Sequence, residues 1–162
     1  MLQQLTQLVE QYAGNAIINN PAIANQHNQA AIQEVAQQIF NSLQNQATSG
    51  NLAQLTNLFQ GNTANINSHP IVAQLISSVA SSMSSKFNMS SQASQQMASN
   101  LLPTVMNQLV NKTNNPNDNS FDLGMMMQTF TGNNNFDISG MLSQLSNSQG
   151  GIGGLLGKLF GR

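Results

Sequence analysis

Apolar side chains recur every three or four residues along most of this chain, a spacing that places them on one face of an α-helix. The clearest stretch carries Ile32, Val35, Ala36, Ile39, Phe40 and Leu43. The sequence shows no sustained alternation of apolar and polar residues, which a half-buried β-strand would require. A chain rich in Asn and Gln can be disordered, but helical periodicity argues for a packed interior. We therefore expect an all-α fold, a multihelical array.

Helix-breaking residues divide residues 1–112 into about five main helices. A first helix should cover residues 2–12, with residues 16–18 as an extension that Pro21 would stop. The second should end before Gly50, and a short third should close at Gly61. The apolar positions of the first and third are Leu2, Leu5, Leu8, Val9 and Tyr12, then Leu52, Leu55, Leu58 and Phe59.

The fourth and fifth helices carry the longest apolar faces. Ser68-His69-Pro70 is typical of a helix start, with proline in the first turn. Ser90 or Ser91 is expected to cap the fifth helix, and Pro103 inside it should kink it or split it in two. The apolar positions of the fourth helix are Ile71, Val72, Leu75, Ile76, Val79, Met83 and Phe87.

The character of the sequence changes at Asn111, where residues 111–120 are turn formers throughout. A short repeat follows: Phe121-Asp122-Leu123-Gly124-Met125-Met126-Met127 is echoed fifteen residues later by Phe136-Asp137-Ile138-Ser139-Gly140-Met141-Leu142. In each copy the aspartate should lie in a first helical turn, where the helix dipole favours negative charge. The expected organisation is a helical core over 1–112, a polar linker with two short Phe-Asp helices over 113–149, and a Gly-rich amphipathic tail over 150–162.

Charge and composition exclude several classes of function. Charged residues make up 6% of the chain and the net charge is −1, so nothing resembles the clustered basic surface that nucleic acid requires. Asn and Gln fill roughly a quarter of the sequence, and such a near-neutral surface offers little repulsion against self-association. There are no cysteines, which excludes disulfides, thiolate catalysis and Cys-ligated zinc. No secretory signal or membrane-spanning run is present, and we expect a cytoplasmic protein, soluble or peripheral.

The histidines and oxygen-rich loops offer weak candidates for a metal site. Neither His27 nor His69 has an acidic or histidine partner three or four residues away, so capping or solvated roles are expected. Asn114, Pro116, Asp118, Ser120 and Asp122 alternate as in a calcium loop. However, Asn119 stands where glycine is needed and Met125 where the closing glutamate should be. A helix-capping turn is the preferred interpretation, and no metal or cofactor is expected.

Catalytic side chains are equally sparse. The five carboxylates are Glu10, Glu34, Asp118, Asp122 and Asp137. We expect the glutamates on the polar sides of their helices and the aspartates at caps or first turns, so no pair faces one pocket. Met125-Met126-Met127 could form an adaptable binding face, although methionine at helical spacing more often fills a core. An enzyme is not expected.

The C-terminal segment is the strongest candidate for an interaction site. One face carries Ile152, Leu155, Leu156, Leu159 and Phe160, and the opposite face carries Gly153, Gly157 and Gly161. Such a seam permits close approach of another helix, and Lys158 and Arg162 would suit an anionic bilayer surface. Each interior glycine costs up to about 1 kcal/mol of helix stability relative to alanine. A loosely docked tail, docking on this or another protein chain, and contact with a membrane surface therefore all stay open.

Several blocks resemble a widespread bacterial family that is known as a domain of unknown function and includes YidB-like proteins. They are Asn19-Asn20-Pro21-Ala22-Ile23, Asn25-Gln26-His27-Asn28, Ser49-Gly50-Asn51-Leu52, Leu102-Pro103, the run from Leu109 through Asn111-Lys112-Thr113-Asn114-Asn115-Pro116-Asn117-Asp118, Phe121-Asp122-Leu123, and the glycine-rich ending. The resemblance spans nearly the whole chain, and the Asn-Lys-Thr-Asn-Asn-Pro-Asn-Asp block is its most specific part. It implies a small, multihelical, non-secreted bacterial protein and brings no catalytic residues. The amide-rich surface is the departure of this chain from the family pattern.

These observations favour a non-enzymatic protein that interacts with itself or with another protein, using the C-terminal segment and the methionine-rich repeats. The alternative is a peripheral membrane-associated protein that binds through its C-terminal Gly/Leu-rich segment without spanning the bilayer. Nucleic acid is not an expected partner.

Overall fold

The computed structural model describes residues 1–61 and 63–132, and within them every regular element is helical. The expected all-α multihelical fold is therefore confirmed. The long elements are α1 (Leu2–Tyr12), α2 (Asn28–Thr48), α3 (Leu52–Gln60), α4 (Pro70–Phe87), α5 (Ser91–Thr113) and α6 (Leu123–Thr131). The short ones are the π-helical turn η1 (Gly14–Ile18) and the 3-10 turns η2 (Asn25–His27), η3 (Thr63–Ser68) and η4 (Asn119–Phe121).

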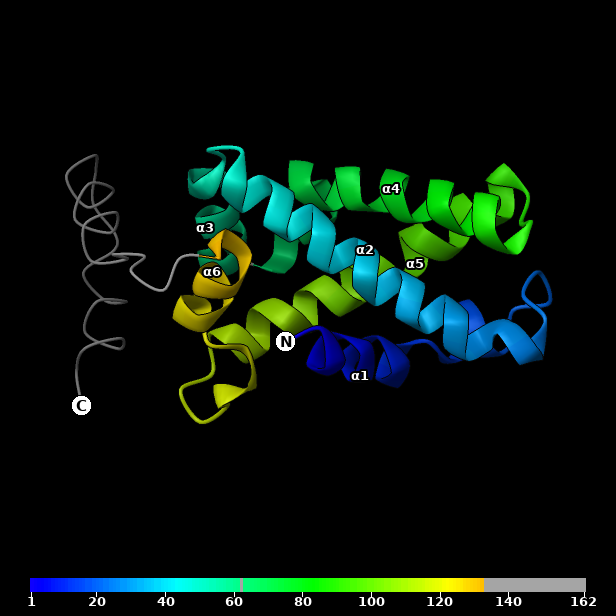
Figure 1. Ribbon diagram of the computed structural model, residues 1–162, viewed down its shortest axis with the longest axis horizontal. Helices are drawn as coiled ribbons and strands as arrows, with labels where there is room; N and C mark the ends of the chain where they lie inside the picture. The colour runs from blue at the N-terminus through cyan, green and yellow to red at the C-terminus, as the bar shows by residue number, and fades with distance from the viewer. Residues whose placement is uncertain (62, 133–162) are drawn as a thin grey trace.

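The three longest helices, α2, α4 and α5, form the body of the described part of the molecule. α2 packs against α1, α4 and α6, while α4 packs most extensively on α5. Figure 1 shows α2 running along the molecule with α4 on one side and α1 on the other, and α6 at the same end as α3. Because each long helix has apolar residues at helical spacing, each buries one face and leaves amides and hydroxyls outside.

The buried side chains of the described residues form one hydrophobic cluster. It includes most apolar positions of the predicted stripes, from Leu5 in α1 to Val110 in α5. The partly buried positions that pack against it are Tyr12, Phe40, Leu52, Ile76 and Phe87, and Leu2 is exposed. The cluster also includes Phe121, Met126, Met127 and Phe130, so η4 and α6 are packed into the same core as the helices that precede them. The ring of Phe130 meets that of Phe40 in α2 edge-on, with centroids 5.5 Å apart. This contact fixes α6 against the long helix.

Most of the predicted helix ends are confirmed, and one is confirmed for a different reason. Ser90 caps α5 by accepting from the Ala93 amide, and Gly50 follows α2 with a φ of +82°. Gly61 ends α3 as predicted, but its φ is −74°, outside the left-handed region that glycine often adopts after a helix. Glycine is required there because a Cβ would lie 2.6 Å from the backbone oxygen of Asn57.

Pro103 does not split α5, which runs as one helix from Ser91 to Thr113. Proline lacks an N–H, so the carbonyl of Ser99 loses its usual partner one turn later. Ser99 is exposed, so water can satisfy that carbonyl. The buried neighbours Leu102 and Val105 hold the helix in place on both sides of the proline.

The turn segment expected from Asn111 begins later in the structure, because α5 continues to Thr113. Leu109 and Val110 are buried, and their packing overrides the weak helix propensity of the residues that follow. Thr113 donates its hydroxyl proton to the Leu109 carbonyl at 2.8 Å, and Asn111 donates to the side chain of Asn107 at 2.9 Å. Local hydrogen bonds thus extend the helix into the turn-forming segment.

The extension of the first helix is π-helical instead of α-helical. The carbonyl of Ala13 accepts from both Ile17 and Ile18, at 2.8 and 3.1 Å. This wider turn keeps Ile17 fully buried, while Ile18 is exposed. Asn20 then donates its amide to the Ala16 carbonyl at 2.8 Å, which closes the turn before Pro21.

Candidate functional site

The predicted interaction residues Ile152, Leu155, Leu156, Leu159 and Phe160, with Gly153, Gly157 and Gly161, lie outside the described residues. The same holds for the second Phe-Asp repeat. Within residues 1–61 and 63–132, a cluster of polar side chains joins α2 to α4.

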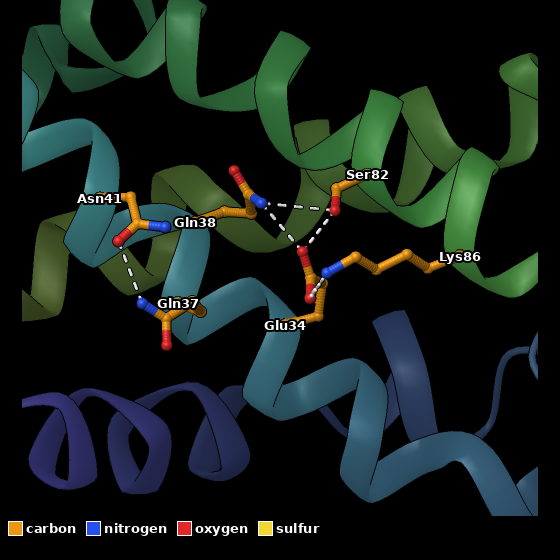
Figure 2. A network of polar contacts seen from close by, with 6 residues as sticks. All are labelled: Glu34, Gln37, Gln38, Asn41, Ser82 and Lys86. Carbon is orange, nitrogen blue, oxygen red and sulfur yellow. Dashed lines mark hydrogen bonds and ion pairs between the residues drawn. The ribbon is translucent and has the colours of Figure 1, made fainter.

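Glu34 is the centre of this cluster, shown in Figure 2. Its Oε2 pairs with Lys86 Nζ at 2.5 Å, and its Oε1 accepts from Ser82 Oγ and from Gln38 Nε2, the latter at 2.9 Å. Its side chain is 11% exposed, whereas that of Lys86 is 57% exposed. Glu34 was expected on the polar side of its helix, but it lies between α2 and α4, where Ser82 and Lys86 of α4 bind its carboxylate.

The hydrogen bonds keep Glu34 ionised. Burial by itself raises the pKa of this carboxyl, but the three donors and the positive charge of Lys86 together lower it below its ordinary value of 4.5. A carboxylate whose oxygens already accept from fixed donors is a poor general base. The cluster therefore acts as a clamp between two helices.

Replacement of Glu34 by glutamine should lower the free energy of unfolding by about 0.5–1 kcal/mol at neutral pH, because the ion pair is partly exposed to solvent. The folded-state pKa lies below 4.5, so this contribution is present above that pH and is lost as the pH falls through the lowered value. Chemical denaturation as a function of pH measures the effect. Glu10→Gln, at an exposed site on α1, is the matched control. An equal effect of both substitutions would contradict a specific clamp.

The residues that alternate in the manner of a calcium loop serve as caps and a tether. Asp118 accepts from the Ser120 amide at 3.0 Å and pairs with Lys112 at 2.9 Å. The hydrogen bond from Lys112 and those from Ser120 lower the pKa of Asp118 to about 2. Asp122 is the N-cap of α6 and accepts from the Met125 amide at 3.0 Å, one position earlier than the first-turn site predicted. A side-chain oxygen at this position satisfies a free amide, which explains the difference. The capping interpretation is confirmed.

The two histidines have separate structural roles. His69 is the N-cap of α4, and its Nδ1 accepts from the Ile71 amide at 3.3 Å. Burial lowers the pKa of His69 below its ordinary value of 6.5. His27 is exposed at the start of α2, and its ring meets that of Phe87 edge-on with centroids 6.3 Å apart. The capping role expected for a histidine is thus confirmed at His69.

The His69 cap should make stability sensitive to mild acid. Nδ1 can accept a hydrogen bond only while it is unprotonated, and the lowered pKa shows that the fold favours the neutral ring. The cap therefore contributes fully above the ordinary value of 6.5, and its contribution falls as the pH drops below that value towards the lowered pKa. His69→Ala should cost about 1 kcal/mol above this window and less below it. His69→Asn should keep the cap but flatten the pH profile, and an unchanged slope would contradict the role.

The three consecutive methionines of α6 were interpreted either as an adaptable binding face or as core residues. Met126 and Met127 are buried, which confirms them as core residues, whereas Met125 is 64% exposed. Met125 and Met126 line a groove together with Met1 and Gln4 of the N-terminal end and with Asp122 and Thr129. Two other grooves are lined mainly by uncharged side chains. One contains Tyr12, Asn15 and Asn100, and the other contains serines of α4 and α5.

Among the described residues, no three histidine or carboxylate side chains come together in a way that could hold a metal ion. None of the described helices combines the length and apolar character needed to cross a bilayer. The amide surface, in contrast, links helices directly: Gln46 donates to Gln74 between α2 and α4 at 2.7 Å, and Asn114 donates to the Phe59 carbonyl at 2.8 Å.

Comparison of the chain with models of protein families, with curated proteins and with solved structures gave no match.

Sequence reasoning missed the Glu34 cluster. Lys86 is 52 residues away from Glu34 in the chain, so no local spacing reveals the pair. The sequence offers one hint, the rarity of its charged residues. With four basic and five acidic side chains, few ion pairs are possible.

Proposed function

We propose that this chain is a non-enzymatic protein-interaction or self-assembly module that uses its C-terminal segment, residues 150–162, as the contact surface. Its partner would be a second copy or another protein. The resemblance to YidB-like proteins agrees with this proposal, because it brings no catalytic residues to this sequence.

The proposal rests on one observation: acidic and histidine side chains of the described residues stabilise the fold. Glu34 joins two helices, Asp118 and Asp122 cap helices, and His69 caps a third. These are the groups from which a general acid, a base or a metal site would be assembled, and each already serves the fold. The stripe from Ile152 to Phe160 lies outside the described residues, and its apolar side chains are spaced as a helix-docking face requires.

Self-association is the first thing to measure. Sedimentation velocity of the intact chain over a range of concentrations should show a concentration-dependent species larger than the monomer. The variant Leu155→Asn with Leu159→Asn should stay monomeric, because it removes the centre of the apolar stripe while keeping the length and charge of the chain. Ser148→Asn with Gln149→Asn, directly before the segment, is the matched control and should behave as the intact chain does.

The same variants separate protein contact from membrane contact. Co-sedimentation with anionic phosphatidylserine vesicles should show no binding that depends on Leu155 and Leu159. Vesicle binding that the stripe variant loses, together with a monomeric intact chain, would replace the proposal by peripheral membrane association. A monomeric intact chain without vesicle binding would leave a heterologous protein as the partner. In that case, pull-downs with the intact and stripe-variant chains should differ in the protein recovered.

A further inference from the structure

The groove that contains Tyr12, Asn15 and Asn100 lies between the end of α1, the π-helical turn η1 and the middle of α5. α5 packs on both α1 and η1, and the buried side chain of Leu101 contributes to the wall of the groove. Its volume of about 500 Å³ falls within the range of about 300–1,000 Å³ that is typical of small-molecule sites. The groove is therefore large enough for a small organic ligand.

Two local features leave this space open. The carbonyl of Ala13 accepts from both Ile17 and Ile18, so the chain makes a wider turn here than an α-helix does. Gly14 lines the groove at that turn, and a Cβ built on it would meet no neighbouring heavy atom of the described residues within 4 Å. Neither a close contact nor a positive φ requires glycine at this position, so the effect of Gly14 is to keep the groove free of a side chain. π-helical turns occur frequently at functional sites.

The polar groups of the groove are neutral, and every described residue that lines it is uncharged. Gln11, Asn15 and Asn100 are exposed and have primary amides, each with two donors and an acceptor, and Thr104 adds a hydroxyl. Elsewhere amides join helices, as Gln46 does. Within the described part of the chain, in contrast, no hydrogen bond involves the side-chain amides of Gln11 and Asn100, so both are available to a ligand.

Tyr12 gives the groove an aromatic wall. Its side chain is partly buried and packs against the hydrophobic core, which holds the ring in place while part of it stays accessible. Among the described residues, the walls of the other two grooves contain no aromatic side chain. A fixed ring beside neutral amides offers apolar contact area together with donors and acceptors that carry no charge.

We propose that the groove between η1 and α5 binds a neutral saccharide, with Tyr12 against the C–H face of a sugar ring and Asn15 and Asn100 hydrogen-bonded to its hydroxyls. A sugar hydroxyl both donates and accepts, as a primary amide does, and it brings no charge that would need a partner. The C–H face of the sugar covers the aromatic ring while the hydroxyls at its edge reach the amides. None of these residues belongs to segment 150–162, so the saccharide site is independent of the function proposed for that segment.

Two-dimensional amide NMR of the isotope-labelled full-length chain tests the site, with cellobiose and N,N′-diacetylchitobiose as separate probes. At least one of these neutral sugars should cause saturable shifts in the amide signals of residues 11–16 and of Asn100, Leu101 and Thr104. Digalacturonic acid should bind more weakly, because only uncharged residues line the groove and its carboxylates would lose water without gaining a cation. The absence of saturable shifts with both neutral sugars, shifts confined to other residues, or binding of the acid at least as tight would overturn the proposal.

Two substitutions make the test specific to this groove. Gly14→Leu fills open space, so the fold should persist by circular dichroism while sugar binding is abolished. Asn100→Ala should weaken binding by about three- to tenfold, the effect of one lost hydrogen bond. Gln95→Ala is the matched control and should keep the parent affinity, because Gln95 is an exposed amide of the same helix that lines the serine groove instead. Parent affinity in the Gly14 or Asn100 variant, or equal losses at Gln95 and Asn100, would contradict the site.

Discussion

Replacement of Leu75 by alanine is expected to lower the free energy of unfolding by about 2–5 kcal/mol. Leu75 is fully buried on α4, the helix that contacts α2, α3 and α5. The truncation removes apolar contacts and leaves a cavity that packed neighbours cannot close. Because domains of this size are stable by only about 5–15 kcal/mol, the loss should be a large part of the total. Urea denaturation followed by circular dichroism measures it.

Leu2→Ala is the matched control for this truncation. The chemical change is the same, but Leu2 is 37% exposed at the start of α1. Its effect should be within about 0.5 kcal/mol. Similar losses at Leu75 and Leu2 would contradict the placement of α4 in the centre of the core.

Truncation of Phe130 to alanine should be as damaging, at about 3–5 kcal/mol. Phe130 is 1% exposed and meets Phe40 of α2 with an interplanar angle of 62°. An edge-on aromatic pair contributes about 0.5–1.5 kcal/mol beyond the apolar area that it buries. Since α6 shares the core with α2, the whole unfolding transition should move to lower denaturant concentration.

Phe130→Leu distinguishes the filling of space from the ring contact. It keeps most of the apolar volume, so it should cost less than the alanine variant and lose mainly the ring contact with Phe40. Thermal unfolding by calorimetry should show one transition in all three chains. A variant in which only a small early transition changes, while the main one stays at the parent temperature, would show α6 to be a separate unit.

The long helices could be predicted because their apolar positions are both periodic and buried. The stripe of α2 is nearly all in the core, and the ends at Gly50, His69 and Ser90 follow from local turn and cap chemistry. Local chemistry predicts such positions without knowledge of any tertiary contact. The same reasoning was sufficient for the Asp122 cap, although it placed the aspartate one position too late.

The errors arose where tertiary packing outweighs local preference. Of the two outcomes expected of Pro103, a kink or a split, the split does not occur, because buried residues on both sides keep α5 one helix. The turn expected from Asn111 begins later, because Leu109 and Val110 anchor the last turn in the core. The π-helical turn at Ala13 depends on which isoleucine the core accepts, and the sequence does not encode that choice locally.

The candidate sites divide in the same way. The capping aspartates and His69 have local partners within three residues, so their roles could be predicted. The clamp from Glu34 to Lys86 and Ser82 joins helices far apart in the chain and needed the fold to reveal it. The C-terminal stripe rests on periodicity alone and stays a prediction, as does the resemblance to YidB-like proteins.

Native-state hydrogen exchange of the backbone amides is the sharpest test of whether α1 to α6 share one interior. If they do, the slowest amides of α2, α4, α5 and α6 should open with the same free energy, and Leu75→Ala should lower all four together. The amides of η1 and of the exposed ends should exchange faster, through local opening. Exchange of α6 with a much smaller opening free energy than that of α2, unchanged by Leu75→Ala, would contradict a single core.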